Sequence, residues 1–148
     1  MAVGRIGRGP EAELFNRYND RLRPKLAVHE IAEGRGSASE IKRREADGIL
    51  AAIPATAFVV ALDLGATAPD SVTFSTRLSG WIELARPLVF VIGGAEGLDS
   101  TVMARANHTL SLGALTWPHM LVRVLLAEQL FRARAIASGH PYHRAGRP

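Results

Sequence analysis

Two short apolar runs constrain the fold of this chain more than any other feature. Ala57 to Leu64 reads AFVVALDL, and Leu88 to Ile92 reads LVFVI. Runs of this length without polar alternation are typical of strands buried in a parallel sheet. The second run continues directly into Gly93-Gly94-Ala95-Glu96-Gly97, so it ends in a glycine loop. We therefore predict a buried, mostly parallel sheet with a glycine loop after one of its strands.

Helical patterns alternate with these strands along the chain. We predict helices at Glu11 to Leu22, from a cap at Ser39 to about Ala52, from Asp70 or Ser71 through Phe74, Leu78, Trp81 and Leu84, at Ser100 to Ala106, and at Pro118 to Ser138. Shorter strands are expected at Leu26 to Ala32 and Thr109 to Leu112. The alternation predicts one α/β domain over residues 1–148, with its ligand beyond the carboxyl ends of the strands.

The last helix is apolar around most of its circumference. Its apolar residues are Leu121, Val122, Val124, Leu125, Leu126, Ala127, Leu130, Phe131, Ala133, Ile136 and Ala137. We expect one face to pack on the sheet and another on a second subunit, which makes the protein a homodimer. Arg123, Glu128, Arg132 and Arg134 are then expected at the edges of the helix or in a shared site. A helix buried centrally within one domain is the alternative.

The charge pattern favours a nucleic-acid partner. The formal net charge is +4, and only Lys25 and Lys42 are lysines among 18 basic residues. Arginine donates two parallel hydrogen bonds to phosphate, although a basic surface that serves only solubility is equally compatible with the charge. The chain has no cysteine, no apolar run of membrane-spanning length and no signal-peptide pattern in its first ten residues. We therefore expect a cytoplasmic protein without a membrane or metal partner.

Two loops are candidates for binding a ligand through backbone groups. The first, Phe90 to Leu98, lacks both the GxGxxG spacing of dinucleotide-binding folds and the GK[ST] ending of a P-loop. The second, Leu110 to His119, reads LSLGALTWPH, and its small residues suit an adenine and a methionine tail. From these residues alone, a structural turn, a structural His119 and a core Trp117 stay open as alternatives.

Four motifs in order carry a family resemblance. They are ALDLG (Ala61 to Gly65), FVIGGAEGL (Phe90 to Leu98), SLGALTWPHMLVRVLLAEQLFRA (Ser111 to Ala133) and GHPYHR (Gly139 to Arg144). Together they resemble the ribosomal RNA large-subunit methyltransferase H family of small SPOUT enzymes, which methylate N3 of a pseudouridine in 23S rRNA. The resemblance implies helices on both faces of the sheet, a C-terminal trefoil knot and a homodimer. It also implies S-adenosylmethionine as the cofactor and 23S rRNA, in the ribosome or large subunit, as the partner.

The resemblance also implies roles for individual residues. The cofactor would lie against Leu62, Gly93, Leu112, Gly113, Ala114, Leu115, Thr116 and Trp117. His119, Arg123, Tyr142 and His143 are the catalytic candidates, and Arg132, His140 and Arg144 would bind the substrate, with Glu128 a further candidate for removing the proton from the imide nitrogen. The chain departs from the family pattern SLSALTLPH at Gly113 and Trp117, a departure expected to affect cofactor affinity.

Two further expectations follow from the same comparison. Family members usually have several strand residues before the AVG that stands here at Ala2 to Gly4, so we expect either a short first strand or a start codon upstream. A non-catalytic RNA-binding or ribosome-associated SPOUT module and a SPOUT enzyme acting on transfer RNA are the alternative functions.

Overall fold

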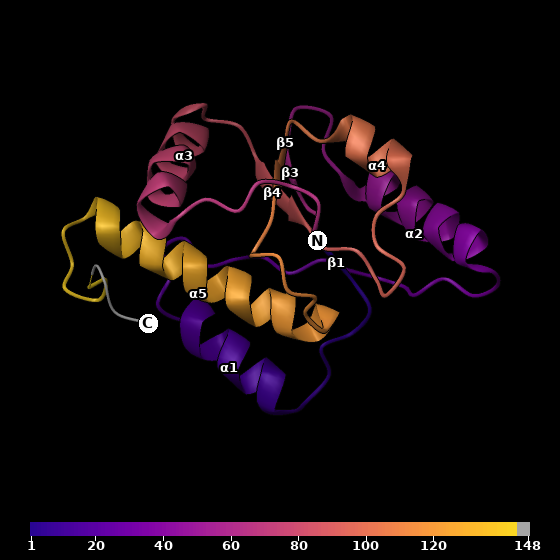
Figure 1. Cartoon of the computed structure of the whole chain (residues 1–148), viewed down its shortest axis with the longest axis horizontal. Coiled ribbons are helices and arrows are strands. Elements are labelled where there is room, and N and C mark those ends of the chain that lie inside the picture. The colour runs from indigo at the N-terminus through magenta and orange to yellow at the C-terminus, as the bar shows by residue number, and fades with distance from the viewer. Residues whose placement is uncertain (145–148) are drawn as a thin grey trace.

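Strands and helices alternate along the chain, as predicted. The computed structural model describes residues 1–144 (Figure 1). The strands are β1 (Ala2–Val3), β2 (Glu30–Ile31), β3 (Phe58–Leu62), β4 (Leu88–Val91) and β5 (His108–Leu110). The helices are α1 (Pro10–Asn19), α2 (Ala38–Ala52), α3 (Ser71–Glu83), α4 (Ser100–Arg105) and α5 (His119–Ala137). The predicted α/β class is confirmed.

All strand pairs of the sheet are parallel. β3 lies between β4 and β5, and β1 pairs with β2. A bridge between Ala2 and Ile92 joins these two parts, with the Val3 amide donating to the Ile92 carbonyl at 3.1 Å. The strand order is therefore β2-β1-β4-β3-β5. This order brings β1, from the very start of the chain, beside the end of β4.

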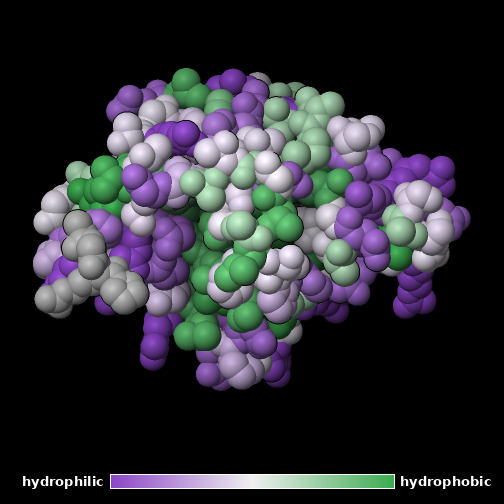
Figure 2. Space-filling view, in the orientation of Figure 1, coloured by the Kyte–Doolittle hydropathy of each residue, from purple (hydrophilic) through white to green (hydrophobic). Residues whose placement is uncertain are grey.

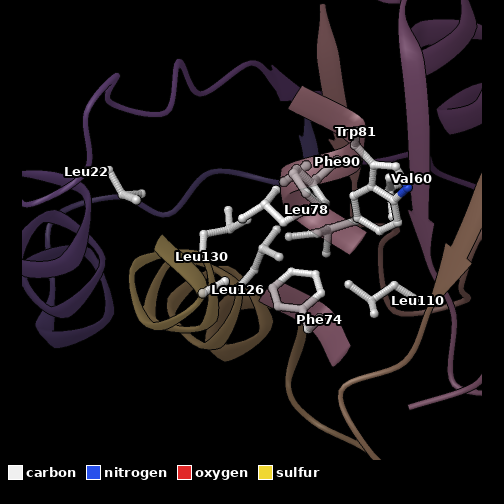
Figure 3. Packing of buried hydrophobic residues seen from close by; sticks show 12 residues of the cluster. Leu22, Val60, Phe74, Leu78, Trp81, Phe90, Leu110, Leu126 and Leu130 are labelled. Atoms are coloured by element: carbon white, nitrogen blue, oxygen red, sulfur yellow. The ribbon is translucent and has the colours of Figure 1, made fainter. Parts of the chain in front are cut away.

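Helices cover both faces of the sheet because side chains alternate along each strand. Val60 and Phe90 face one side, where they pack with α3 and α5 (Figure 3). Val59 and Val91 face the other side, where they pack with residues of α2 and α4 such as Ile49 and Val102. The expected layers are confirmed, and the trefoil knot stays a prediction.

α5 is buried by other parts of its own chain more than we expected. Leu126 and Leu130 face the sheet and α3 (Figure 3). Phe15 of α1 packs against Val124 on another side of α5. α1 therefore covers part of the surface that we expected a second subunit to cover. Leu125 remains half-buried. Among the helices of residues 1–144, none is long and apolar enough to cross a membrane.

Several predicted boundaries were wrong for local reasons. The cap of α2 is Ser37 and not Ser39, because Ser37 and Glu40 form a reciprocal capping box. α1 ends at Asn19, before the predicted Leu22. The Asn19 side chain then holds the backbone of Leu26, accepting from its amide at 2.7 Å and donating to its carbonyl at 3.2 Å. These two side-chain hydrogen bonds take the place of strand pairing at Leu26. The observed strand therefore covers only Glu30–Ile31.

Candidate functional site

A pocket of about 340 Å³ lies at the carboxyl ends of β3, β4 and β5. This is the position at which ligands bind in open parallel sheets. Its walls come from residues 62–64, 92–98, 110–113 and 115–117, together with His119 and Val122. All the predicted cofactor residues except Ala114 line it. The two predicted loops therefore enclose one space.

The glycine loop after β4 forms a tight turn, and its backbone comes close to Gly93. The Gly97 amide donates to the Gly94 carbonyl at 3.1 Å, and Gly97 has a φ of +78°. A Cβ on Gly93 would lie 3.0 Å from the carbonyl carbon of Gly97. A side chain at position 93 would therefore force the loop's own backbone to shift, which favours glycine there.

A buried glutamate supports this loop from behind. Glu45 of α2 is 4% exposed, and its Oε1 accepts a hydrogen bond from the Gly34 amide at 3.0 Å. A Cβ on Gly94 would lie only 2.9 Å from Glu45 Oε2. Glu45 was not predicted from the sequence, because an acidic residue in the middle of a helix gives no sign of its burial.

The second loop is held by a serine and presents apolar side chains outward. Ser111 Oγ donates to the Gly113 carbonyl at 3.0 Å and accepts from the Gly113 amide at 3.2 Å. Gly113 has a φ of +116°, a conformation that favours glycine. Leu115 is 70% exposed and Trp117 is 40% exposed, so Trp117 is not a core residue.

Two carboxylates in the pocket were also missed. Asp63 follows β3 directly, and Glu96 lies in the glycine loop. Asp63 Oδ2 accepts from the Gly65 amide at 3.0 Å, which fixes the turn after the strand. Their positions after buried strands were a usable signal, because the carboxyl ends of parallel strands meet at one edge. The pocket thus combines apolar walls with negative charge.

Arg123 is buried and does not lie at an edge of the helix, which was one of the two positions expected for it; the other, a shared site, stays a prediction. It is 3% exposed, and its Nη2 donates to the carbonyls of Val3 at 2.6 Å and Gly4 at 2.7 Å. Its Nη1 forms an ion pair with Glu30 Oε1 at 3.1 Å. The same Glu30 oxygen accepts from the Ile6 amide at 2.8 Å. Arg123 therefore ties α5 to β1, β2 and the segment that follows β1.

The C-terminal tail folds back on the second half of α5. Tyr142 Oη donates to Glu128 Oε1 at 3.0 Å, and Arg132 Nη2 donates to the same oxygen at 2.5 Å. The Tyr142 ring packs on Phe131 with a centroid distance of 4.7 Å. Burial and the Glu128 hydrogen bond raise the pKa of Tyr142 well above its usual range. The phenol is therefore a hydrogen-bond donor at neutral pH.

The remaining tail candidates lie beside this cluster. His140 is exposed, and its Nδ1 accepts from the Tyr142 amide at 3.2 Å. Arg144 is exposed, and His143 is half-buried with its Nδ1 unpaired within the described residues. Apart from the buried Arg123 and from Ala114, the predicted site residues thus form two groups.

The two groups lie at opposite ends of α5. His119 begins the helix and lines the pocket, whereas Arg132 lies thirteen residues later. At 1.5 Å of rise per residue, their backbones are about 20 Å apart. One chain therefore does not bring its own tail cluster to its own pocket.

Comparison with known proteins identifies the family. A family model described as "Predicted SPOUT methyltransferase" matches residues 1–143. A relative from Gluconacetobacter diazotrophicus is 62% identical over 148 residues, which cover 100% of this chain and 97% of the relative. Relatives from Acidiphilium cryptum and Rhodospirillum rubrum are 57% and 51% identical, covering 100% and 97% of this chain and 94% and 96% of the relatives. All three are named "Ribosomal RNA large subunit methyltransferase H". The chain therefore belongs to the SPOUT methyltransferase family.

Proposed function

We propose that this protein transfers the methyl group of S-adenosylmethionine to N3 of a pseudouridine in 23S rRNA. The relatives' shared name supports a large-subunit rRNA substrate. The observation that carries the proposal is the pocket between the two loops at the carboxyl ends of the strands. The loops that enclose it are the segments whose motifs resemble the cofactor loops of the family.

The pocket suits the chemistry of S-adenosylmethionine. Leu62, Leu112 and Trp117 provide apolar surface for an adenine, and the glycine loop leaves its backbone accessible. Asp63 and Glu96 supply negative charge for the sulfonium and ammonium groups. When bound, this cofactor supplies an electrophilic methyl group, and the protein has to align the acceptor nitrogen and exclude water.

The RNA would approach along the segment after β1. Gly4 lies against His119, since a Cβ on Gly4 would be 3.5 Å from His119 Nε2. Arg5 and Arg8 follow within four residues and are exposed. Their guanidinium groups are suited to phosphates at the mouth of the pocket.

The candidate catalytic residues divide by their chemistry. Tyr142 keeps its proton at neutral pH, so we assign it and Arg132 to hydrogen bonding with the substrate. His119 in the pocket and His143 in the tail remain the candidates for accepting the imide proton. Arg123 is assigned a positioning role, because its donors hold β1.

A homodimer would bring the two groups of residues together. Figure 2 shows hydrophobic residues gathered near the middle of the face that α5 crosses in Figure 1. Leu121 and Leu125 of α5 are half-buried, and Leu14 of α1 is 40% exposed. A second subunit packed there with its α5 reversed would place its tail beside this pocket. Because the substrate is ribosomal RNA, we place the enzyme in the cytoplasm.

Two measurements test the proposed function. We expect heat on titration with S-adenosylmethionine and a methyl group on a 23S pseudouridine, absent by mass spectrometry in cells that lack the gene. No binding would favour a non-catalytic ribosome-associated module. Cofactor binding with methylation of transfer RNA, and none of ribosomes, would assign a different substrate.

Mixed dimers test the shared site. A variant lacking residues 140–144 should bind cofactor but not methylate ribosomes, and Gly93→Val should fail to bind cofactor. Mixing the two should restore activity, because one pocket then has an intact loop and an intact tail. If subunits exchange and activity does not return, each chain completes its own site.

A further inference from the structure

Glu45 is a buried carboxylate to which the proposed chemistry assigns no role. It lies in the middle of α2 and is 4% exposed. Within residues 1–144 it forms no ion pair, and its Oε2 atom is buried without a hydrogen-bond partner. Burying a carboxylate is costly unless hydrogen bonds compensate for its lost hydration. A donor that reaches Oε2 would therefore stabilise the protein.

This carboxylate faces the glycine loop of the pocket. A Cβ on Gly94 would lie 2.9 Å from Glu45 Oε2 and 3.1 Å from Oε1, so both oxygens lie beside the loop backbone. Residues 93–97 have no side-chain N–H group, so a donor from this loop has to be a backbone amide. The Gly97 amide already donates to the Gly94 carbonyl. The amides of Gly94 and of the adjoining Ala95 are therefore the candidate donors.

The other oxygen of the carboxylate holds the segment between β2 and α2. Oε1 accepts from the Gly34 amide at 3.0 Å. Gly34 lies tightly against α2, since a Cβ there would be 2.8 Å from the Cα atom of Ile41. The preceding residue, Glu33, lies against Gly4 together with a residue of the pocket: a Cβ on Gly4 would be 2.7 Å from Glu33 Oε1 and 3.5 Å from His119 Nε2. Residues 33–34 therefore lie beside the part of the pocket that His119 lines.

We propose that Glu45 is a positioning residue that ties the cofactor loop to residues 33–34. In the cofactor-bound protein, Oε2 accepts a hydrogen bond from the amide of Gly94 or Ala95, while Oε1 keeps the Gly34 amide. A carboxylate accepts hydrogen bonds on both oxygens at once, and these bonds are stronger than those of a neutral acceptor. The inference rests on the proposed function, which assigns the glycine loop to S-adenosylmethionine.

This tie raises cofactor affinity although Glu45 does not line the pocket. The loop backbone meets the cofactor on its pocket side and the carboxylate on its other side. A loop whose conformation is fixed by a second hydrogen bond loses less conformational freedom when the ligand binds. Because the same side chain holds Gly34, cofactor binding also orders the backbone beside His119.

Replacing Glu45 by glutamine in the full chain tests the tie. Glu45→Gln keeps the size and one acceptor oxygen, but it presents an NH2 group in place of the second oxygen. We expect the Kd for S-adenosylmethionine to rise about tenfold or more, while the circular dichroism spectrum stays native. In the parent, saturating cofactor should slow hydrogen exchange of the Gly94 or Ala95 amide about tenfold, measured by nuclear magnetic resonance. The saturated variant should lack this slowing.

A second variant approaches the same contact from the loop. Gly94→Ala places a Cβ 2.9 Å from Glu45 Oε2, so it should also weaken cofactor binding. The two losses should not add in the double variant, because both changes disturb one contact. Asp47→Asn, on the exposed side of α2, is the control for removing a charge. Ile49→Val, on the buried side, is the control for lost stability. Neither control should change the Kd.

The outcomes separate the tie from the proposed function. Equal cofactor affinity of Glu45→Gln and the parent, or the same slowing of exchange in both, overturns the proposal and leaves Glu45 with a structural role. Weaker binding of S-adenosylmethionine with unchanged binding of S-adenosylhomocysteine also overturns it, because the carboxylate would then act by attracting the sulfonium charge. If the parent itself does not bind S-adenosylmethionine, the proposed function fails together with the tie. If the parent binds and only the variant comparison fails, the tie alone is wrong.

Discussion

Replacing Arg123 by alanine should lower the stability of the fold rather than remove one catalytic step. The guanidinium makes two buried hydrogen bonds to the carbonyls of Val3 and Gly4 and an ion pair with Glu30. Each carbonyl left unpaired costs about 1–3 kcal/mol. The lost ion pair adds less than the about 3–5 kcal/mol of a fully buried pair, because the Glu30 side chain is 31% exposed. These contributions overlap, so we expect a loss of about 3–5 kcal/mol in the free energy of unfolding, a large part of the usual stability of about 5–15 kcal/mol.

Urea denaturation followed by circular dichroism measures this loss. Arg132→Ala is the matched control on the same helix, because Arg132 is partly exposed and pairs with Glu128 four residues earlier. That pair should contribute no more than about 1 kcal/mol to stability. We therefore expect Arg123→Ala to shift the urea midpoint strongly, and Arg132→Ala to lower methylation with little shift. An unchanged midpoint for Arg123→Ala, together with lost methylation, would refute this reasoning and restore Arg123 as a catalytic residue.

Three more variants and one pH series extend the tests. Gly93→Val should abolish cofactor binding in calorimetry while the circular dichroism spectrum stays native, because the valine side chain would collide with the backbone at Gly97. If the variant kept its affinity for the cofactor, the loop would be a structural turn and not a binding loop. Gly80→Ala, on the exposed side of α3 with nothing within 4 Å of the new Cβ, should stabilise the fold by about 0.5–1 kcal/mol in urea. Leu125→Glu should give a monomeric mass by light scattering. If the variant dimerised with unchanged affinity, α5 would not be part of the interface. Because the folded-state pKa of the Met1 amine is about 6 and its unfolded value is 8.0, the unfolded chain binds more protons between these values. Stability should therefore fall by about 2 kcal/mol from pH 8 to pH 6, and acetylation of the amine should remove this dependence.

The pocket loops were largely predictable because local sequence determines them. The run from Leu88 to Ile92 followed by glycines specifies a buried strand and a tight turn, and both are present. The pocket contains Gly93, Leu112 and Trp117, as the motifs implied. Asp63 could have been added by the same reasoning, since it directly follows a predicted strand.

The sequence by itself determined the alternation of strands and helices, because the spacing of apolar residues differs between the two. It also identified the two loops, through glycines and small residues whose backbone conformations are local properties. Only the tertiary structure decided that α1 covers one side of α5, that Arg123 is buried under β1, and that Met1 lies within the sheet. The physical reason is that burial depends on which distant segments meet. The carbonyls that hold Arg123 lie about 120 residues away in the chain, and no local pattern records that contact.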